Sequence, residues 1–121
     1  MNNTEPDAYL RDVDREFFER ELASFVPERI YDAHCHLWHE EQHRVGVPAI
    51  PSSVGYDEYR RLIDGLHPGR PVASLFIPMP SKRELMHLAN EWIGRHAAAD
   101  PDCRGLFFVK PEDDPEWVRQ E

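Results

Sequence analysis

Short apolar runs that alternate with amphipathic helical segments constrain the fold of this chain more than any other feature. Three runs have the length and composition of strands: 29–36, 72–77 and 106–109. Three segments carry a helical stripe: 13–26, 56–66 and about 81–100. A fourth helix is expected to begin at Pro115. Strands that alternate with helices predict an α/β fold with parallel strands joined by right-handed crossovers.

Local signals predict how these elements begin and what they bury. Phe18, Leu22 and Phe25 recur at helical spacing in the first helical segment, which should therefore bury all three. Ser81 and Glu84 have the spacing of a capping box, which predicts that the third helix begins there. The run 72–77 (VASLFI) is continuously apolar, as is typical of a parallel strand that is covered on both faces.

Composition excludes several classes of protein. The chain has 121 residues, the size of one domain, and its 14 Lys and Arg against 23 Asp and Glu give a net charge of −9. This charge repels phosphate backbones, so we expect no nucleic-acid binding. No apolar run approaches the roughly 18–20 residues that span a bilayer. Cys35 and Cys103 lie in no CxxC motif. These features predict a cytoplasmic protein with no membrane partner.

The segment Ile30 to Leu37 (IYDAHCHL) carries the chemistry. Residues i and i+2 of a strand face the same way, so His34 and His36 should project together at the strand's carboxyl end. Two neutral imidazoles in this arrangement suit a divalent metal, with zinc as the first expectation. Asp32 is expected on the same face, where its carboxylate could orient an imidazole. An H-x-H pair also arises by chance in a chain with seven histidines, but the strand-end position and Asp32 favour the metal.

Other polar residues have weaker claims. Trp38 and Lys110 are candidates for a substrate pocket, because they follow the ends of the first and third expected strands; packing and solvation are the alternatives. Cys35 should point toward the helix layer as a small buried hydrophobe. The remaining histidines are assigned to loops, a turn and the solvent face of the third helix: His39, His43, His67, His87 and His96.

The run DAHCHLW (32–38) resembles the D-x-H-x-H motif on the first strand of the amidohydrolase superfamily. Two later segments resemble its amidohydrolase-related branch: PGRPVASLFIPMP (68–80) and FFVKPEDDPEWV (107–118). The resemblance covers about residue 29 to the end of the chain. It implies that 28–121 form the N-terminal part, two to three βα units, of a metal-dependent (β/α)8 barrel, and that 1–27 are a helical extension.

The same resemblance implies a hydrolase in which a metal-activated water attacks an amide, ester or related bond of a small-molecule substrate. His34 and His36 would be the first two metal ligands. In that family the other ligands and the proton-transferring groups come from later strands, and a barrel of this type needs about 200–250 residues. We therefore expect the chain to be inactive alone and its catalytic residues to be unknown from this sequence. A homo-oligomer or a missing C-terminal portion would complete it.

Three alternatives remain at this level. DAHCHL also resembles the opening of TatD-type deoxyribonucleases, which would make the protein a metal-dependent phosphoesterase or nuclease. Some relatives in the amidohydrolase-related branch are decarboxylases, which would replace hydrolysis by carbon–carbon cleavage. The third alternative is a non-catalytic remnant whose strand edges pair with another chain.

Overall fold

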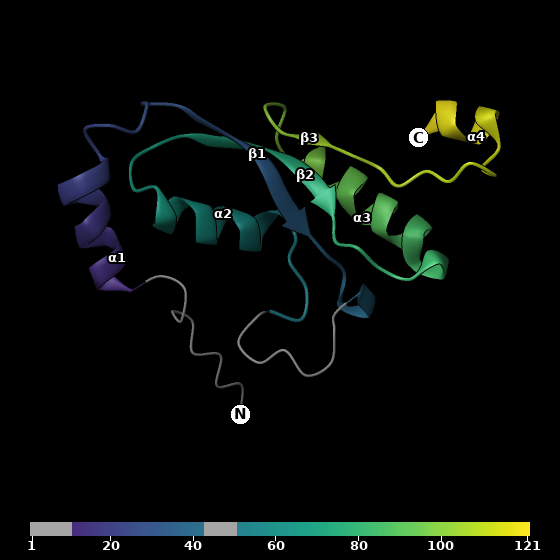
Figure 1. Cartoon of the computed structure of the whole chain (residues 1–121), viewed down its shortest axis with the longest axis horizontal. Coiled ribbons are helices and arrows are strands. Elements are labelled where there is room, and N and C mark those ends of the chain that lie inside the picture. Colours follow the sequence, from purple (N-terminus) through teal and green to yellow (C-terminus); the bar gives the residue numbers. More distant parts are fainter. Residues whose placement is uncertain (1–10, 43–50) are drawn as a thin grey trace.

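Three parallel strands form the centre of the fold, in the order β1-β2-β3 (Figure 1). The computed structural model describes residues 11–42 and 51–121. The strands are β1 (Ile30–Leu37), β2 (Val72–Pro78) and β3 (Arg104–Gly105). Helix α2 (Tyr56–Leu66) connects β1 to β2, and α3 (Met86–Ala97) connects β2 to β3. The predicted α/β class with a parallel sheet is therefore confirmed.

Shorter helices flank this unit. Helix α1 (Asp12–Phe17) runs into a π-helix, η1 (Phe18–Leu22), and α4 (Pro115–Gln120) lies near the C-terminus. One 3₁₀ turn, η2 (Glu40–Gln42), lies between β1 and α2, and a second, η3 (Arg83–Leu85), lies between β2 and α3. Pro115 is the first residue of α4, as predicted, and the carboxylate of Asp114 caps that helix. Within the part of the chain that the structure describes, no helix is long and apolar enough to cross a membrane.

Helices α2 and α3 both pack on one face of the sheet. The alternate residues Val72, Ser74 and Phe76 of β2 are buried there, against Tyr59 of α2 and Ile93 of α3. The intervening residues of β2 on the opposite face are only partly buried: Ala73, Leu75 and Ile77. The prediction that β2 is covered on both faces is thus wrong for the described residues. Continuous hydrophobicity reports what a strand can bury, and the helices here cover one side.

The first helical segment is shorter than predicted. It ends at Leu22, and of the three expected core residues only Phe18 is buried, with its ring 5.8 Å from that of His67. Leu22 is partly exposed and Phe25 is 84% exposed. The prediction failed because helical spacing identifies a common face, whereas burial needs a second element opposite that face.

The predicted capping box at the start of the third helix is also wrong. The chain forms η3 first, and α3 begins only at Met86, without a side-chain cap. The amide of the buried Gln42 donates to the Met79 carbonyl over 3.1 Å and lies 3.4 Å from the Ser81 hydroxyl. Ser81 is therefore engaged with the segment that follows β1, a contact that its local sequence does not encode.

The third strand was predicted at 106–109, but β3 is Arg104–Gly105. The amide of Leu106 still donates to the Phe76 carbonyl over 2.9 Å. Beyond it, the side chain of Asn90 takes the place of a neighbouring strand. Its Nδ2 donates to the Phe108 carbonyl over 2.9 Å, and its Oδ1 accepts from the Phe108 amide over 2.8 Å. A side-chain amide thus satisfies the backbone where the predicted ladder would have continued.

Candidate metal and substrate site

A register shift in β1 decides which side chains share a face. Asp32 pairs with Ser74, and Cys35 pairs with Phe76, so β1 contains one more residue than β2 between these pairs. Asp32 and Cys35 consequently face the helices, whereas His36, which pairs with Ile77, faces the open side of the sheet. The prediction that Asp32 shares a face with the histidines is wrong, because the bulge reverses the alternation.

The structure brings His34 and His36 together, as the strand spacing predicted. Their Nε2 atoms are 3.1 Å apart, and their rings meet edge to face with centroids 4.9 Å apart. Nδ1 of His36 lies 3.2 Å from the Ile77 carbonyl. Because a carbonyl oxygen can only accept, this contact places the proton of neutral His36 on Nδ1 and leaves the lone pair of Nε2 free toward His34.

This geometry fits a metal ion. At zinc–nitrogen distances of about 2.0–2.1 Å, a separation of 3.1 Å corresponds to an angle of about 100° at the metal, close to tetrahedral. Metal-binding imidazoles commonly donate their other ring N–H to a carbonyl, as His36 does to Ile77. Without a metal, His34 can donate its Nε2 proton to His36, and a cation would replace that proton.

Asp32 acts on the pair through the backbone. Its Oδ1 accepts a hydrogen bond from the amide of His34 over 2.9 Å, across the bulge. The carboxylate thus holds the main chain of the first histidine, and its role as a partner of an imidazole ring stays a prediction. Its charge also acts on Cys35: burial first, and then Asp32, raise the pKa of that thiol to about 12. Cys35 is therefore a protonated thiol on the helix side, as expected.

Trp38 and His36 line one cavity of about 240 Å³ between the end of β1 and α2. The other walls come from Cys35, from Pro51 and Val54, and from Tyr59, Leu62, Ile63 and Leu66 of α2. The Trp38 indole donates to the Pro51 carbonyl over 3.1 Å, and its backbone forms an antiparallel bridge with Val54. The α2 residues were predicted only as a core stripe. The sequence signal for this cavity is that the apolar stripe of α2 extends to Leu66 at the end of the helix. In the structure the side chain of Leu66 is 45% exposed.

Lys110 is engaged within its own turn. Its Nζ lies 3.3 Å from a carboxylate oxygen of Asp113, and its backbone amide donates to the same carboxylate over 2.6 Å. Burial alone would raise the pKa of Asp113, but these hydrogen bonds and the lysine charge lower it overall. The described contacts of Lys110 are those of a residue that holds a turn, and a role in substrate binding stays a prediction.

The structure places the other histidines differently from one another, and His67, in its turn, packs against Phe18. His39 packs edge to face on Trp92 with centroids 4.9 Å apart, whereas His43 lies outside the described residues. His87 is exposed beside Trp117, as expected for a solvent-facing position. His96 is half-buried, with its ring 4.3 Å from that of Trp92, and its Nδ1 accepts from the Tyr56 amide. The prediction that His96 faces solvent is therefore wrong: helix α3 uses it to hold the start of α2.

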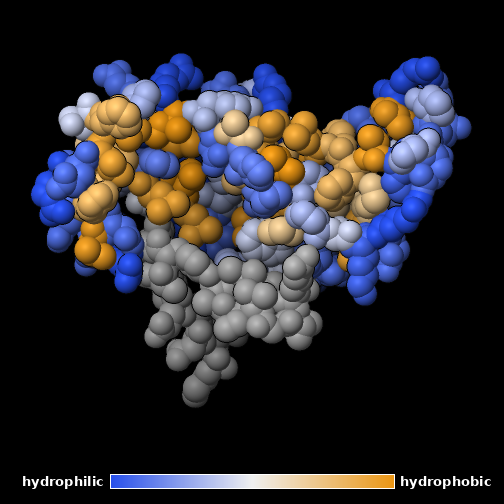
Figure 2. All heavy atoms as spheres, viewed as in Figure 1, coloured by the Kyte–Doolittle hydropathy of each residue, from blue (hydrophilic) through white to orange (hydrophobic). Residues whose placement is uncertain are grey.

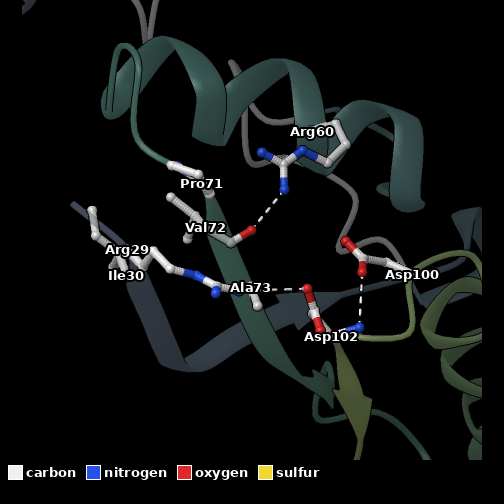
Figure 3. A pocket seen from close by; sticks show the side chains of 8 residues that line it. All are labelled: Arg29, Ile30, Arg60, Pro71, Val72, Ala73, Asp100 and Asp102. Atoms are coloured by element: carbon white, nitrogen blue, oxygen red, sulfur yellow. Dashed lines mark hydrogen bonds and ion pairs between the residues drawn. The ribbon is translucent and has the colours of Figure 1, made fainter.

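Another cavity, of about 170 Å³, lies at the amino ends of the strands (Figure 3). Arg29 lies 3.8 Å from Asp102 across it, and Arg60 donates to the Val72 carbonyl over 2.7 Å. The amide of Asp102 in turn donates to Asp100. These charges are engaged with one another and with the backbone. In parallel α/β sheets, ligands bind at the carboxyl ends of the strands, where the histidine pair lies.

Within residues 11–42 and 51–121, no group of three or more His, Cys, Asp or Glu side chains is placed to hold a metal ion. A metal ion at His34 and His36 would therefore need further ligands from outside the described residues of this chain. Comparison of the chain with protein-family models, with curated proteins and with solved structures finds no match.

Proposed function

We propose that this protein is a metal-dependent hydrolase of the amidohydrolase type, to which His34 and His36 contribute two ligands of a divalent metal, zinc first. The observation that carries the proposal is the pair of Nε2 atoms 3.1 Å apart, with His36 oriented by the Ile77 carbonyl. Strands in the order β1-β2-β3, with one helix in each connection, are also how a (β/α)8 barrel begins, which supports that architecture.

Each residue of the site has a distinct task in this proposal. His36 is held by a carbonyl and presents one nitrogen lone pair. His34 is exposed, and the carboxylate of Asp32 fixes its backbone, so its ring can move onto a metal without a change in the strand. With a metal bound, the two histidines would hold the Lewis acid that activates a water for attack. The reaction would also need a further ligand and a general base, from outside the described residues or from another chain.

Metal content of the purified chain tests the proposal. We expect about one zinc or similar ion per chain or per oligomer, and loss of this metal in the His34→Ala, His36→Ala double variant. His87→Ala removes an exposed histidine of α3 and serves as the matched control, which should keep the metal. Equal metal content in the double variant and the wild type would overturn the assignment.

Substrate assays then separate the reaction classes. Zinc-dependent hydrolysis of an activated ester or amide, lost in the double variant but kept in His87→Ala, is the expected result once the site is completed. Cleavage of a phosphodiester such as bis(p-nitrophenyl) phosphate in place of the ester would favour the phosphoesterase alternative. Release of carbon dioxide from an aromatic carboxylate would favour the decarboxylase.

A further inference from the structure

The sheet face opposite α2 and α3 is open in the part of the chain that the structure describes, and the histidine pair lies on it. His36 pairs with Ile77 on this face, and its Nε2 atom is 3.1 Å from that of the exposed His34. Tyr31 of β1 lies on the same face, because it pairs with Ala73, and its side chain is 53% exposed. A second molecule that covers this face would therefore contact the imidazoles directly.

The surface around the pair is apolar. Gly105 of β3 pairs with Phe76 on the helix side of the sheet. Its neighbours Arg104 and Leu106 therefore face the open side, where Leu106 is 46% exposed. Figure 2 shows hydrophobic side chains at the surface across the middle of the molecule, where Figure 1 places the sheet. The residues of β2 on the open face are only partly buried: Ala73, Leu75 and Ile77. A contiguous apolar surface of this kind is typical of a contact between proteins.

The charges on this face favour a second copy of the chain over a charged partner. Each chain has a net charge of −9, so two copies repel each other wherever their carboxylates meet. The described strand residues on the open face include no Asp or Glu, because the bulge turns Asp32 to the helix side. The one cation among them, Arg104, already donates to the carbonyls of Pro101 and Cys103. A charged partner would gain little there, whereas a second copy meets a nearly neutral surface like its own.

The metal site supplies the reason for this pairing. Two imidazoles leave a zinc ion short of ligands, and the described residues of the chain bring no third His, Cys, Asp or Glu to it. Every copy presents the same two nitrogen atoms on its open face. A two-fold axis through this face would therefore bring the pair of one copy opposite the pair of the other.

We infer that a second copy of this chain covers the open face of the sheet, and that its His34 and His36 complete the metal site. Three of the four imidazoles would make up the ligand set typical of a catalytic zinc. The fourth would be available as the general base that the proposed reaction lacks. The inference rests on the proposed function for the metal and deepens it by naming the partner.

The test is sedimentation equilibrium of the full chain with and without zinc, together with the ratio of bound zinc to chain. We expect zinc to strengthen dimerisation at least about tenfold and to bind at one ion per two chains. The His34→Ala, His36→Ala double variant should lose both effects, and His87→Ala, at an exposed position of α3, should keep them. A dimer whose strength does not depend on zinc would overturn the inference.

A variant of the open face tests where the two copies meet. Tyr31→Arg places on this face a charge that cannot bind zinc, and it should weaken zinc-dependent dimerisation at least about tenfold. Val118→Arg makes the same change at an exposed position of α4 and should have no effect. Should Tyr31→Arg fail to fold, Leu106→Arg provides the same test from the other side of the sheet. Equal dimerisation in the open-face variant and in Val118→Arg would contradict the inference.

The stoichiometry distinguishes failure of this inference from failure of the proposed function. A monomer that binds one zinc ion per chain, lost in the double variant, would overturn the second copy and leave the proposed metal site standing. A wild-type chain that binds no zinc would overturn the proposed metal site, and the inference with it.

Discussion

The backbone amide of Tyr56 donates a hydrogen bond to Nδ1 of His96 over 3.0 Å, so an imidazole of α3 holds the first residue of α2. Only the ring with a free Nδ1 lone pair can accept this bond. Burial first, and then the charge of Arg95, lower the pKa of His96 below its ordinary value of 6.5, while Asp57 opposes this shift. The unfolded chain consequently binds a proton at this residue at a higher pH than the folded chain does.

The first prediction is a loss of stability as the pH falls through 6.5. Between the lowered pKa and 6.5 the unfolded state carries more protons, so the free energy of unfolding must rise with pH in that window and level off above it. Urea unfolding at about pH 5.5 and pH 7.5 measures the difference. His96→Phe should reduce it, and His87→Gln, at an exposed position of the same helix, should leave it unchanged. An identical pH dependence in His96→Phe would contradict the prediction.

The second prediction concerns Asn90, which is 2% exposed and bonds both backbone groups of Phe108. Asn90→Ala should lower the free energy of unfolding by about 2 kcal/mol, because two partly buried backbone groups of Phe108 lose their partners. Asn90→Asp should cost at least as much, since a carboxylate cannot donate to the Phe108 carbonyl. Hydrogen exchange of the Phe108 amide should accelerate in Asn90→Ala and not in Asn90→Asp, because the carboxylate can still accept from that amide. Glu91→Ala, at the exposed neighbouring position, is the control, and equal exchange in Asn90→Ala and in this control would refute the role of Asn90.

The third prediction contrasts Gly105 of β3 with Gly94 of α3. A Cβ on Gly105 would lie 2.6 Å from Cγ2 of Ile93, so Gly105→Ala should destabilise the protein by about 1–3 kcal/mol. A Cβ on Gly94 would meet only the ring of Phe107 at 3.9 Å, and Gly94→Ala should stabilise α3 by about 0.5–1 kcal/mol. Thermal and urea unfolding measure both changes. The two variants should change the free energy of unfolding with opposite signs. If Gly105→Ala leaves this free energy unchanged, Ile93 can move aside and the prediction is wrong.

The fourth prediction concerns Asp32, whose carboxylate accepts from the His34 amide. Asp32→Ala should weaken zinc binding about tenfold, because the bulge that carries His34 loses its side-chain anchor. Asp32→Asn keeps an oxygen acceptor and should bind zinc nearly as the wild type does. Competition with a chromophoric chelator gives the affinities. If Asp32→Asn weakens zinc binding as much as Asp32→Ala does, the prediction is wrong. The charge of Asp32, and not its hydrogen bond to the His34 amide, would then support the metal site.

Much of the framework follows from local periodicity. The bounds of α2, the position of β2, the start of α4 at Pro115 and the shared direction of His34 and His36 were all predicted correctly. Each depends on residues a few positions apart, on helical or strand spacing, or on the fixed backbone angle of a proline. Such features need no information about what lies opposite in space.

Tertiary structure decided the rest. The pairing of β1 with β2 created the bulge that turns Asp32 to the helix side, and the Asn90 side chain replaced the strand partner of Phe108. Contact with the segment after β1 engaged Ser81, and the start of α2 turned His96 from a solvent position into a hydrogen-bond acceptor. Each outcome depends on a backbone or side-chain group that finds its partner between about 18 and 42 positions away in the chain. Sequence spacing cannot supply such a partner, because burial and hydrogen bonding are satisfied across space and not along the chain.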